Sequence, residues 1–352
     1  MQPAAGIPGP TVSMLRLHRL LFVAVVLTIV ASVAVQVGAG RQAAPAPASP
    51  APAAGTADGS VRTLTHDGRQ RMYLVHDFGH GKPAPVVIVL HGGGGNAENA
   101  VKMSGFDRVA ERDGFIAVYP NGTGARTSER FLTWNAGHCC AGAMDGHVDD
   151  VGFVSAIIDA LVATRRADPA RVYVTGMSNG GMMAHRMGRE LSETIAAIAP
   201  VVGAVFGDEP PPRAPMPAFI VAGAEDQIIP PGGGPLTVRL LLGRRAAADR
   251  EVAPAIAQGE YWARANGCGE PLKTETAAYV KTAWETCRSG APVVFLSVAR
   301  NGHAWPGGVA GRANAAQPTQ AFDATEAMWA FFKTQSRPRE TPHGSATRPG
   351  AR

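Results

Sequence analysis

The stretch RVYVTGMSNGGMMA, residues 171–184, decides the architecture expected for this chain. Its first five residues are mostly β-branched or aromatic and predict a buried strand, and its last residues predict a helix. Between them, Gly176 and Gly180 flank Ser178 in the pattern G-x-S-x-G. Small residues at the two flanking positions allow a sharp turn from strand to helix with the serine at its apex. A serine oxygen exposed at such a turn is placed to attack a carbonyl carbon.

A serine nucleophile needs a base and an acid, and both are expected downstream of this kind of turn. The segment PAFIVAGAEDQIIP places Asp226 just after a predicted strand, and SVARNGHAWPGG places His303 just after the last one. We therefore predict a catalytic triad in which His303 activates Ser178 and Asp226 orients the imidazole. Glu225, beside Asp226, is the alternative acid. Trp305 either lines the substrate pocket or packs in the core.

Negative charge on the attacked carbonyl oxygen requires backbone N–H donors. One donor is expected from Asn179, which follows the serine, and the other from the glycine-rich loop that begins at His91. Within that loop Gly93 is the predicted donor, while His91 and Gly92 are predicted to contact the substrate. A phosphate-binding loop is excluded because no Lys-Ser or Lys-Thr pair follows the glycines.

Predicted strands and helices alternate through the middle of the chain. Strands are expected at 69–75, 85–90, 115–119, 171–175, 195–202, 218–222 and 293–298, and helices at 150–163 and 325–332. This alternation predicts an α/β fold with a mostly parallel central sheet covered by helices on both faces. Asp149 or Asp150 is expected to cap the helix at 150–163 and not to act as the catalytic acid, because both precede the serine.

The two ends of the chain lie outside the predicted domain, which covers 60–336. Residues 1–39 combine basic residues with a long apolar run and small residues before Ala39, which is typical of an export signal; an uncleaved membrane anchor is the alternative. Residues 40–59 predict a Pro/Ala-rich linker, and 337–352 a disordered tail. We therefore expect a secreted or periplasmic protein that contacts a membrane only if the export segment is not cleaved.

The composition excludes several classes of protein. The chain has 352 residues, of which 45% are hydrophobic, so it can fill a core, and disorder throughout is excluded. Its formal net charge of +5 comes from the two terminal segments, and the middle of the chain has no excess of basic residues. We therefore expect no nucleic-acid site.

Four cysteines in an exported chain allow up to two disulfides. Cys268 and Cys287 are expected to pair because they close a short loop. The pairing of Cys139 and Cys140 stays open, since adjacent cysteines can bridge only through a strained ring. Together with the histidines near them, these two thiols do not have a usual zinc-ligand spacing, and no metal is expected.

These stretches together resemble the secreted polyhydroxybutyrate depolymerase and feruloyl or acetylxylan esterase group of α/β-hydrolases, also called carbohydrate esterase family one. The matching stretches are LHGGGGN at 90–96, VYPNG at 118–122, WNAGHCC at 134–140, DDVGF at 149–153, RVYVTGMSNGGMMA at 171–184 and GHAWPGG at 302–308. The resemblance implies the α/β-hydrolase fold and a Ser-Asp-His triad at Ser178, Asp226 and His303. The chain departs from the pattern at 230–254, a segment that contains Arg239, Arg244 and Arg245.

The resemblance implies a secreted serine esterase that forms an acyl-enzyme on Ser178. The expected substrates are polyhydroxybutyrate or hydroxyalkanoate oligomers, or feruloyl or acetyl esters of plant polysaccharide, with no cofactor and no obligate protein partner. Two alternatives stay open: a serine peptidase of the same fold, and an exported binding protein without turnover. A peptidase usually carries an extra gating domain, for which 60–336 has no room.

Overall fold

The computed structural model describes residues 59–124, 131–236, 250–311 and 315–338. The predicted export segment, nearly all of the predicted linker and most of the predicted tail lie outside the described residues, as do Arg239, Arg244 and Arg245. The domain boundaries expected from the sequence therefore stay predictions. Among the described helices, none is both long and apolar enough to cross a membrane.

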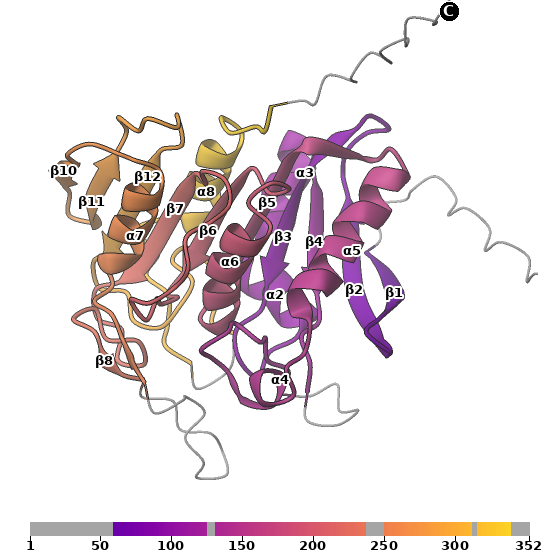
Figure 1. Ribbon diagram of the computed structural model, residues 1–352, viewed down its shortest axis with the longest axis horizontal. Helices are drawn as coiled ribbons and strands as arrows, with labels where there is room; N and C mark the ends of the chain where they lie inside the picture. The colour runs from indigo at the N-terminus through magenta and orange to yellow at the C-terminus, as the bar shows by residue number, and fades with distance from the viewer. Residues whose placement is uncertain (1–58, 125–130, 237–249, 312–314, 339–352) are drawn as a thin grey trace, which may run out of the picture. The chain divides into compact units, whose positions relative to one another are not determined.

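The described residues form a ten-stranded sheet in the order β1-β2-β4-β3-β5-β6-β7-β12-β11-β10 (Figure 1). The strands are β1 (Ser60–His66), β2 (Arg69–Asp77), β3 (Ala84–Leu90), β4 (Ile116–Pro120), β5 (Ala167–Met177), β6 (Ala197–Val201), β7 (Ala218–Gly223), β10 (Leu272–Glu275), β11 (Tyr279–Trp284) and β12 (Val293–Val298). From β4 to β12 in this order, neighbouring strands run parallel, and the strands outside this block pair antiparallel. The predicted mostly parallel sheet is confirmed.

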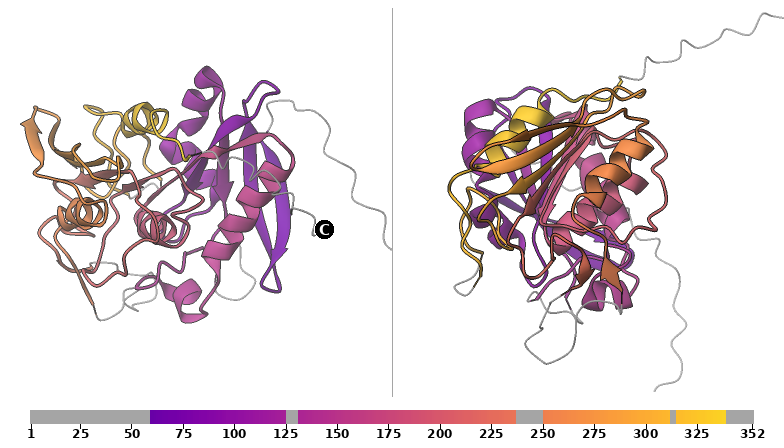
Figure 2. Two further views of the ribbon diagram at one scale, coloured as in Figure 1. Left: turned by 45° about the horizontal axis from the view of Figure 1, so that its top comes forward. Right: turned by 90° about the vertical axis from the view of Figure 1, so that its left-hand side faces the viewer.

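Helices cover both faces of this sheet (Figures 1 and 2). The larger helices are α2 (Ala97–Ser104), α3 (Phe106–Asp113), α5 (Asp150–Ala163), α6 (Asn179–Glu190), α7 (Ala257–Ala265) and α8 (Ala324–Phe332). Successive residues of β3 point to opposite faces: Ile88 joins a core cluster with α5, α6 and α7, and Val87 joins one with α2, α3 and α8. Every residue of β3 is buried, as expected for a strand covered on both faces.

Each strand predicted from an apolar run has a counterpart in the sheet, but the antiparallel strands β1, β10 and β11 were not predicted. The edge strand β1 pairs with β2 through a two-residue turn at Asp67 and Gly68, both of which have positive φ. A short helix, α4 (Ala141–Asp145), and the two-stranded pair β8 (Gly234–Pro235) and β9 (Glu251–Val252) complete the described elements.

The cap of α5 is Asp149, whose side chain accepts a hydrogen bond from the N–H of Gly152.

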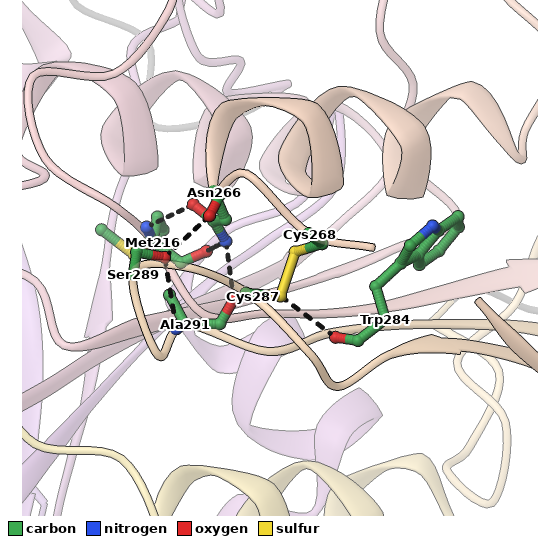
Figure 3. Close-up of a disulfide and its surroundings, with 7 residues drawn as sticks. All are labelled: Met216, Asn266, Cys268, Trp284, Cys287, Ser289 and Ala291. Carbon is green, nitrogen blue, oxygen red and sulfur yellow. Dashed lines mark hydrogen bonds between the residues drawn. A yellow bond between two sulfur atoms is a disulfide. The ribbon is translucent and has the colours of Figure 1, made fainter. Parts of the chain in front are cut away.

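A disulfide joins Cys268 to Cys287, as the sequence predicts (Figure 3). It connects the loop after α7 to the segment between β11 and β12. Nearby, the side chain of Asn266 accepts a hydrogen bond from the N–H of Met216 at 3.0 Å and donates to the carbonyl oxygens of Met216 and Ala291. These contacts attach α7 to the end of the sheet that carries β12. The sulfur atoms of Cys139 and Cys140 lie next to each other, and a cis peptide bond joins the two residues.

Candidate active site

Ser178 lies at the turn between β5 and α6, where its φ is 59° and its side chain is partly exposed. The two glycines of the motif are required by close packing. A Cβ atom on Gly176 would lie 2.6 Å from the carbonyl oxygen of Gly180, and one on Gly180 would lie 2.5 Å from that of His91. The N–H of Ser178 donates to the carbonyl oxygen of Val201 at 2.9 Å. The strand-turn-helix geometry expected for a nucleophilic serine is therefore present.

Asp226 and His303 meet across the ends of two adjacent parallel strands, β7 and β12. The Oδ2 atom of Asp226 lies 2.7 Å from the Nδ1 atom of His303, and both side chains are largely buried. The other carboxylate oxygen accepts hydrogen bonds from the N–H groups of Ile228 and Ile229, at 2.8 and 2.9 Å. An ionised Asp226 would accept a hydrogen bond from a protonated Nδ1 in this contact, and that arrangement would leave Nε2 available as a base.

Glu225, the alternative acid, occupies a different position. Its side chain is exposed, and its backbone N–H donates to the carbonyl oxygen of Asn301 at 3.0 Å. Gly223, two residues earlier, permits this close approach, because a Cβ atom there would lie 2.5 Å from the same oxygen. The structure thus brings Asp226, and not Glu225, to the imidazole.

The glycine-rich loop after β3 lies against the serine turn. A Cβ atom on Gly92 would be 3.6 Å from the Cβ atom of Ser178, and one on Gly93 would be 3.7 Å from that of Asn179. Gly93 is exposed. The two predicted oxyanion donors, Gly93 and Asn179, are therefore neighbours in space, although their role stays a prediction.

Two residues considered for substrate binding, His91 and Trp305, are buried. His91 is fully buried; its Nδ1 atom lies 2.8 Å from the carbonyl oxygen of Gly92, and its Nε2 atom accepts from the N–H of Gly122. These contacts attach the glycine-rich loop to the segment that contains Gly122. Trp305 is also buried, and its indole N–H donates to Thr325 at 2.9 Å. Of the two alternatives for Trp305, the structure shows core packing.

The contacts of Trp134, the first residue of WNAGHCC at 134–140, were not predicted from the sequence. The side-chain amide of Asn179 accepts from the backbone N–H of Trp134 at 2.7 Å and donates to its carbonyl oxygen at 3.0 Å. The indole N–H of Trp134 donates to the carbonyl oxygen of His91 at 2.9 Å. No local pattern indicates these contacts, because they join three segments that are far apart in sequence.

Among the residues that the structure describes, no group of three or more His, Cys, Asp or Glu side chains is arranged so that it could bind a metal ion. His138, beside the two adjacent cysteines, instead contacts Arg250, with 2.8 Å between its Nδ1 atom and the guanidinium. Arg250 in turn pairs with Asp208 at 2.7 Å.

A mostly parallel sheet covered by helices, with a serine at a strand-helix turn and an acid-histidine pair after later strands, defines the α/β-hydrolase class. Residues 73–229 match the model of the family described as esterase PHB depolymerase. The putative esterase NocK of Nocardia uniformis subsp. tsuyamanensis is 31% identical over 269 residues, which cover 71% of this chain and 74% of that protein. The chain therefore belongs to the esterase PHB depolymerase family, a family of carboxylic ester hydrolases, and the resemblance inferred from the sequence is confirmed.

Two further proteins are similar to this chain. Feruloyl esterase B of Piromyces equi is 29% identical over 231 residues, 63% of this chain, and the matched part is 40% of that protein. The solved structure of an acetyl xylan esterase from Aspergillus awamori superimposes with a TM-score of 0.50 at 17% identity, covering 70% of this chain and 94% of that one. This second likeness supports the fold.

Proposed function

We propose that this protein is a secreted serine esterase that hydrolyses carboxylic esters through an acyl-enzyme on Ser178. The observation that carries the proposal is the buried contact between Asp226 and His303. This contact lies at the carboxyl ends of the parallel strands, and Ser178 follows the carboxyl end of β5. Carboxyl ends of parallel strands lie at one edge of a sheet, and the three side chains follow β5, β7 and β12.

The chemistry follows from these positions. The Oγ atom of Ser178 attacks the ester carbonyl carbon while Nε2 of His303 takes the hydroxyl proton, and Asp226 stabilises the imidazolium. The N–H groups of Asn179 and Gly93 donate to the oxyanion. When the tetrahedral intermediate collapses, His303 returns the proton to the departing alcohol. A water molecule then attacks the acyl-enzyme with His303 again as base, which releases the carboxylic acid and restores Ser178.

The proposed substrates are hydroxyalkanoate oligomers, or feruloyl or acetyl esters of plant polysaccharide. Support comes from the name of the family model and from the feruloyl and acetyl xylan esterases among the similar proteins. Export is proposed from residues 1–39, which combine basic residues with an apolar run.

A substrate panel tests this proposal with the full chain. Nitrophenyl acetate and butyrate, methyl ferulate, acetylated xylan, hydroxybutyrate oligomers and a peptide anilide are each assayed with the wild type and with Ser178→Ala. We expect turnover of at least one ester class that depends on Ser178. Faster cleavage of the anilide than of every ester would indicate a peptidase. Failure of the wild type to hydrolyse any substrate would favour a binding role.

A further inference from the structure

Trp134 contacts both segments that are proposed to supply the oxyanion donors. Its backbone pairs at two points with the side-chain amide of Asn179, at 2.7 and 3.0 Å. Its indole N–H donates to the carbonyl oxygen of His91, the first residue of the glycine-rich loop, at 2.9 Å. Its ring also packs on the His91 imidazole, with 4.9 Å between the ring centroids. One residue therefore connects the serine turn, through its backbone, to the glycine-rich loop, through its fully buried side chain.

The loop that carries Trp134 is itself held by a buried charge. The N–H of Asn135 donates to Oδ2 of Asp150 at 2.8 Å, and the guanidinium of Arg71 contacts Oδ1 at 2.6 Å. Asp150 is fully buried at the start of α5, and Arg71 on β2 is nearly so. Charge-assisted hydrogen bonds of this kind restrict the backbone strongly. The backbone next to Trp134 is thus held in place by Asp150, which is itself held by Arg71.

The spacing of the two donors matters for the proposed reaction. An oxyanion hole works only when its N–H groups are fixed about 3 Å from the developing negative charge. A displacement of about 1 Å, even one caused at a distance, can lower a rate about a hundredfold. Gly93 and Asn179 belong to different segments, so their separation depends on what joins those segments.

We propose that Trp134 is a positioning residue that sets the distance between Gly93 and Asn179, and that its indole N–H is needed for this in addition to its ring. The inference rests on the proposed function, because it assigns a role within that same site. Trp134 acts through the side chain of Asn179 and the carbonyl group of His91, and does not itself touch the substrate.

The test compares two variants that each lose one buried indole N–H. Trp134→Phe removes the donor to His91 and keeps an aromatic ring. Trp262→Phe is the matched control: Trp262 on α7 is also fully buried, and its N–H donates to Nδ1 of His185 at 2.9 Å, outside the proposed site. We expect Trp134→Phe to lower kcat about tenfold or more with KM changed less than about twofold, because the lost alignment affects mainly the transition state. For Trp262→Phe, kcat should stay within about twofold of the wild type.

A boronic acid inhibitor supplies a second measurement. It forms a tetrahedral adduct with an active serine and presents an oxygen where the oxyanion would lie. Its inhibition constant should rise in Trp134→Phe by about the factor lost in kcat/KM, because both report binding of the tetrahedral state. The pH profile of kcat should keep its shape, since the contact between Asp226 and His303 is untouched. If Trp134→Phe does not fold, 3-benzothienylalanine at position 134, which keeps the bicyclic shape without the N–H, replaces it.

The outcomes separate the two proposals. Equal effects of the two phenylalanine variants on kcat and on boronic acid inhibition would overturn the role of Trp134 and leave the esterase proposal intact. An absence of ester turnover that depends on Ser178 would overturn both.

Discussion

The carboxylate of Asp226 lies 2.7 Å from the Nδ1 atom of His303, although 77 residues separate them in the sequence. The register of β7 and β12, in which Gly223 is opposite Val298, brings their carboxyl ends level. Hydrogen bonds from the N–H groups of two following residues hold the second carboxylate oxygen of Asp226 in place. The orientation of the imidazole is therefore determined by two loops that contact each other only because their strands are neighbours.

The first prediction distinguishes the two adjacent acids. Asp226→Asn should lower kcat about a thousandfold or more, because the amide favours the wrong imidazole tautomer and no longer stabilises the imidazolium. Glu225→Gln should change kcat little, since the Glu225 side chain is exposed. Steady-state kinetics on one nitrophenyl ester checks both variants. The reverse ranking would contradict the assignment of Asp226.

The second prediction concerns the nucleophile. Ser178→Ala should lower kcat by about four orders of magnitude or more and leave only the catalysis due to the oxyanion donors and binding. Mass spectrometry after treatment with an alkyl phosphonate should find the adduct on Ser178 in the wild type and no adduct in the variant. Circular dichroism serves as the control for folding. A phosphonate adduct on a different serine would refute the assignment.

A third prediction uses the close packing at Gly223. Gly223→Ala would push a methyl group to 2.5 Å from the carbonyl oxygen of Asn301, so the loops that carry Asp226 and His303 must separate. We expect kcat to fall about tenfold or more through the lost alignment. Gly269→Ala is the matched control, because a Cβ atom there meets nothing nearer than 3.7 Å. Similar kinetics for both variants would show that the loops tolerate the methyl group.

The fourth prediction concerns the disulfide between Cys268 and Cys287, which closes a short loop with a sequence separation of 19. Replacing both cysteines with serine should lower the free energy of unfolding by about 3 kcal/mol, because the unfolded chain gains conformational freedom. Urea unfolding of the variant and the wild type measures the difference. Peptide mapping without reductant should recover the two cysteines in one linked pair, and two free thiols would contradict the prediction.

The fifth prediction is a pH dependence of stability due to His185 on α6. Burial lowers the pKa of His185 from 6.5 to about 4, because the charged imidazolium loses its contact with water, and the hydrogen bond to Gln258 offsets only part of this effect. Between these pH values the unfolded state binds the proton and the folded state does not, so stability falls as the pH is lowered through that window. The loss between pH 7.5 and 4 should be about 3 kcal/mol.

His185→Gln is the comparison for this prediction, because it removes the titrating ring and keeps hydrogen-bonding groups. The difference in unfolding free energy between wild type and variant, measured by urea unfolding, should shrink as the pH falls from 7.5 to 4. A difference that stays constant with pH would show that His185 does not titrate in this way.

The sequence alone determined the features that depend on neighbouring residues. The alternation of apolar strands and helices predicted the parallel sheet, and G-x-S-x-G predicted the turn at Ser178, because backbone preference and the period of burial are local properties. The dipeptide Asp67-Gly68, which joins β1 to β2, is also a local hairpin signal. The order of Ser178, Asp226 and His303 along the chain was also visible without the structure.

Only the tertiary structure decided which side chains meet. The sequence favours Asp226 as the acid and leaves Glu225 as the alternative. The turn after β7 exposes Glu225 and buries Asp226 against His303. His91 was predicted to contact the substrate, and Trp305 either to line the pocket or to pack in the core; both are buried. The contacts of Trp134 with Asn179 and His91 join segments from three parts of the chain. Such contacts depend on strand order and register, which are set by the packing of the whole sheet and not by any single stretch of sequence.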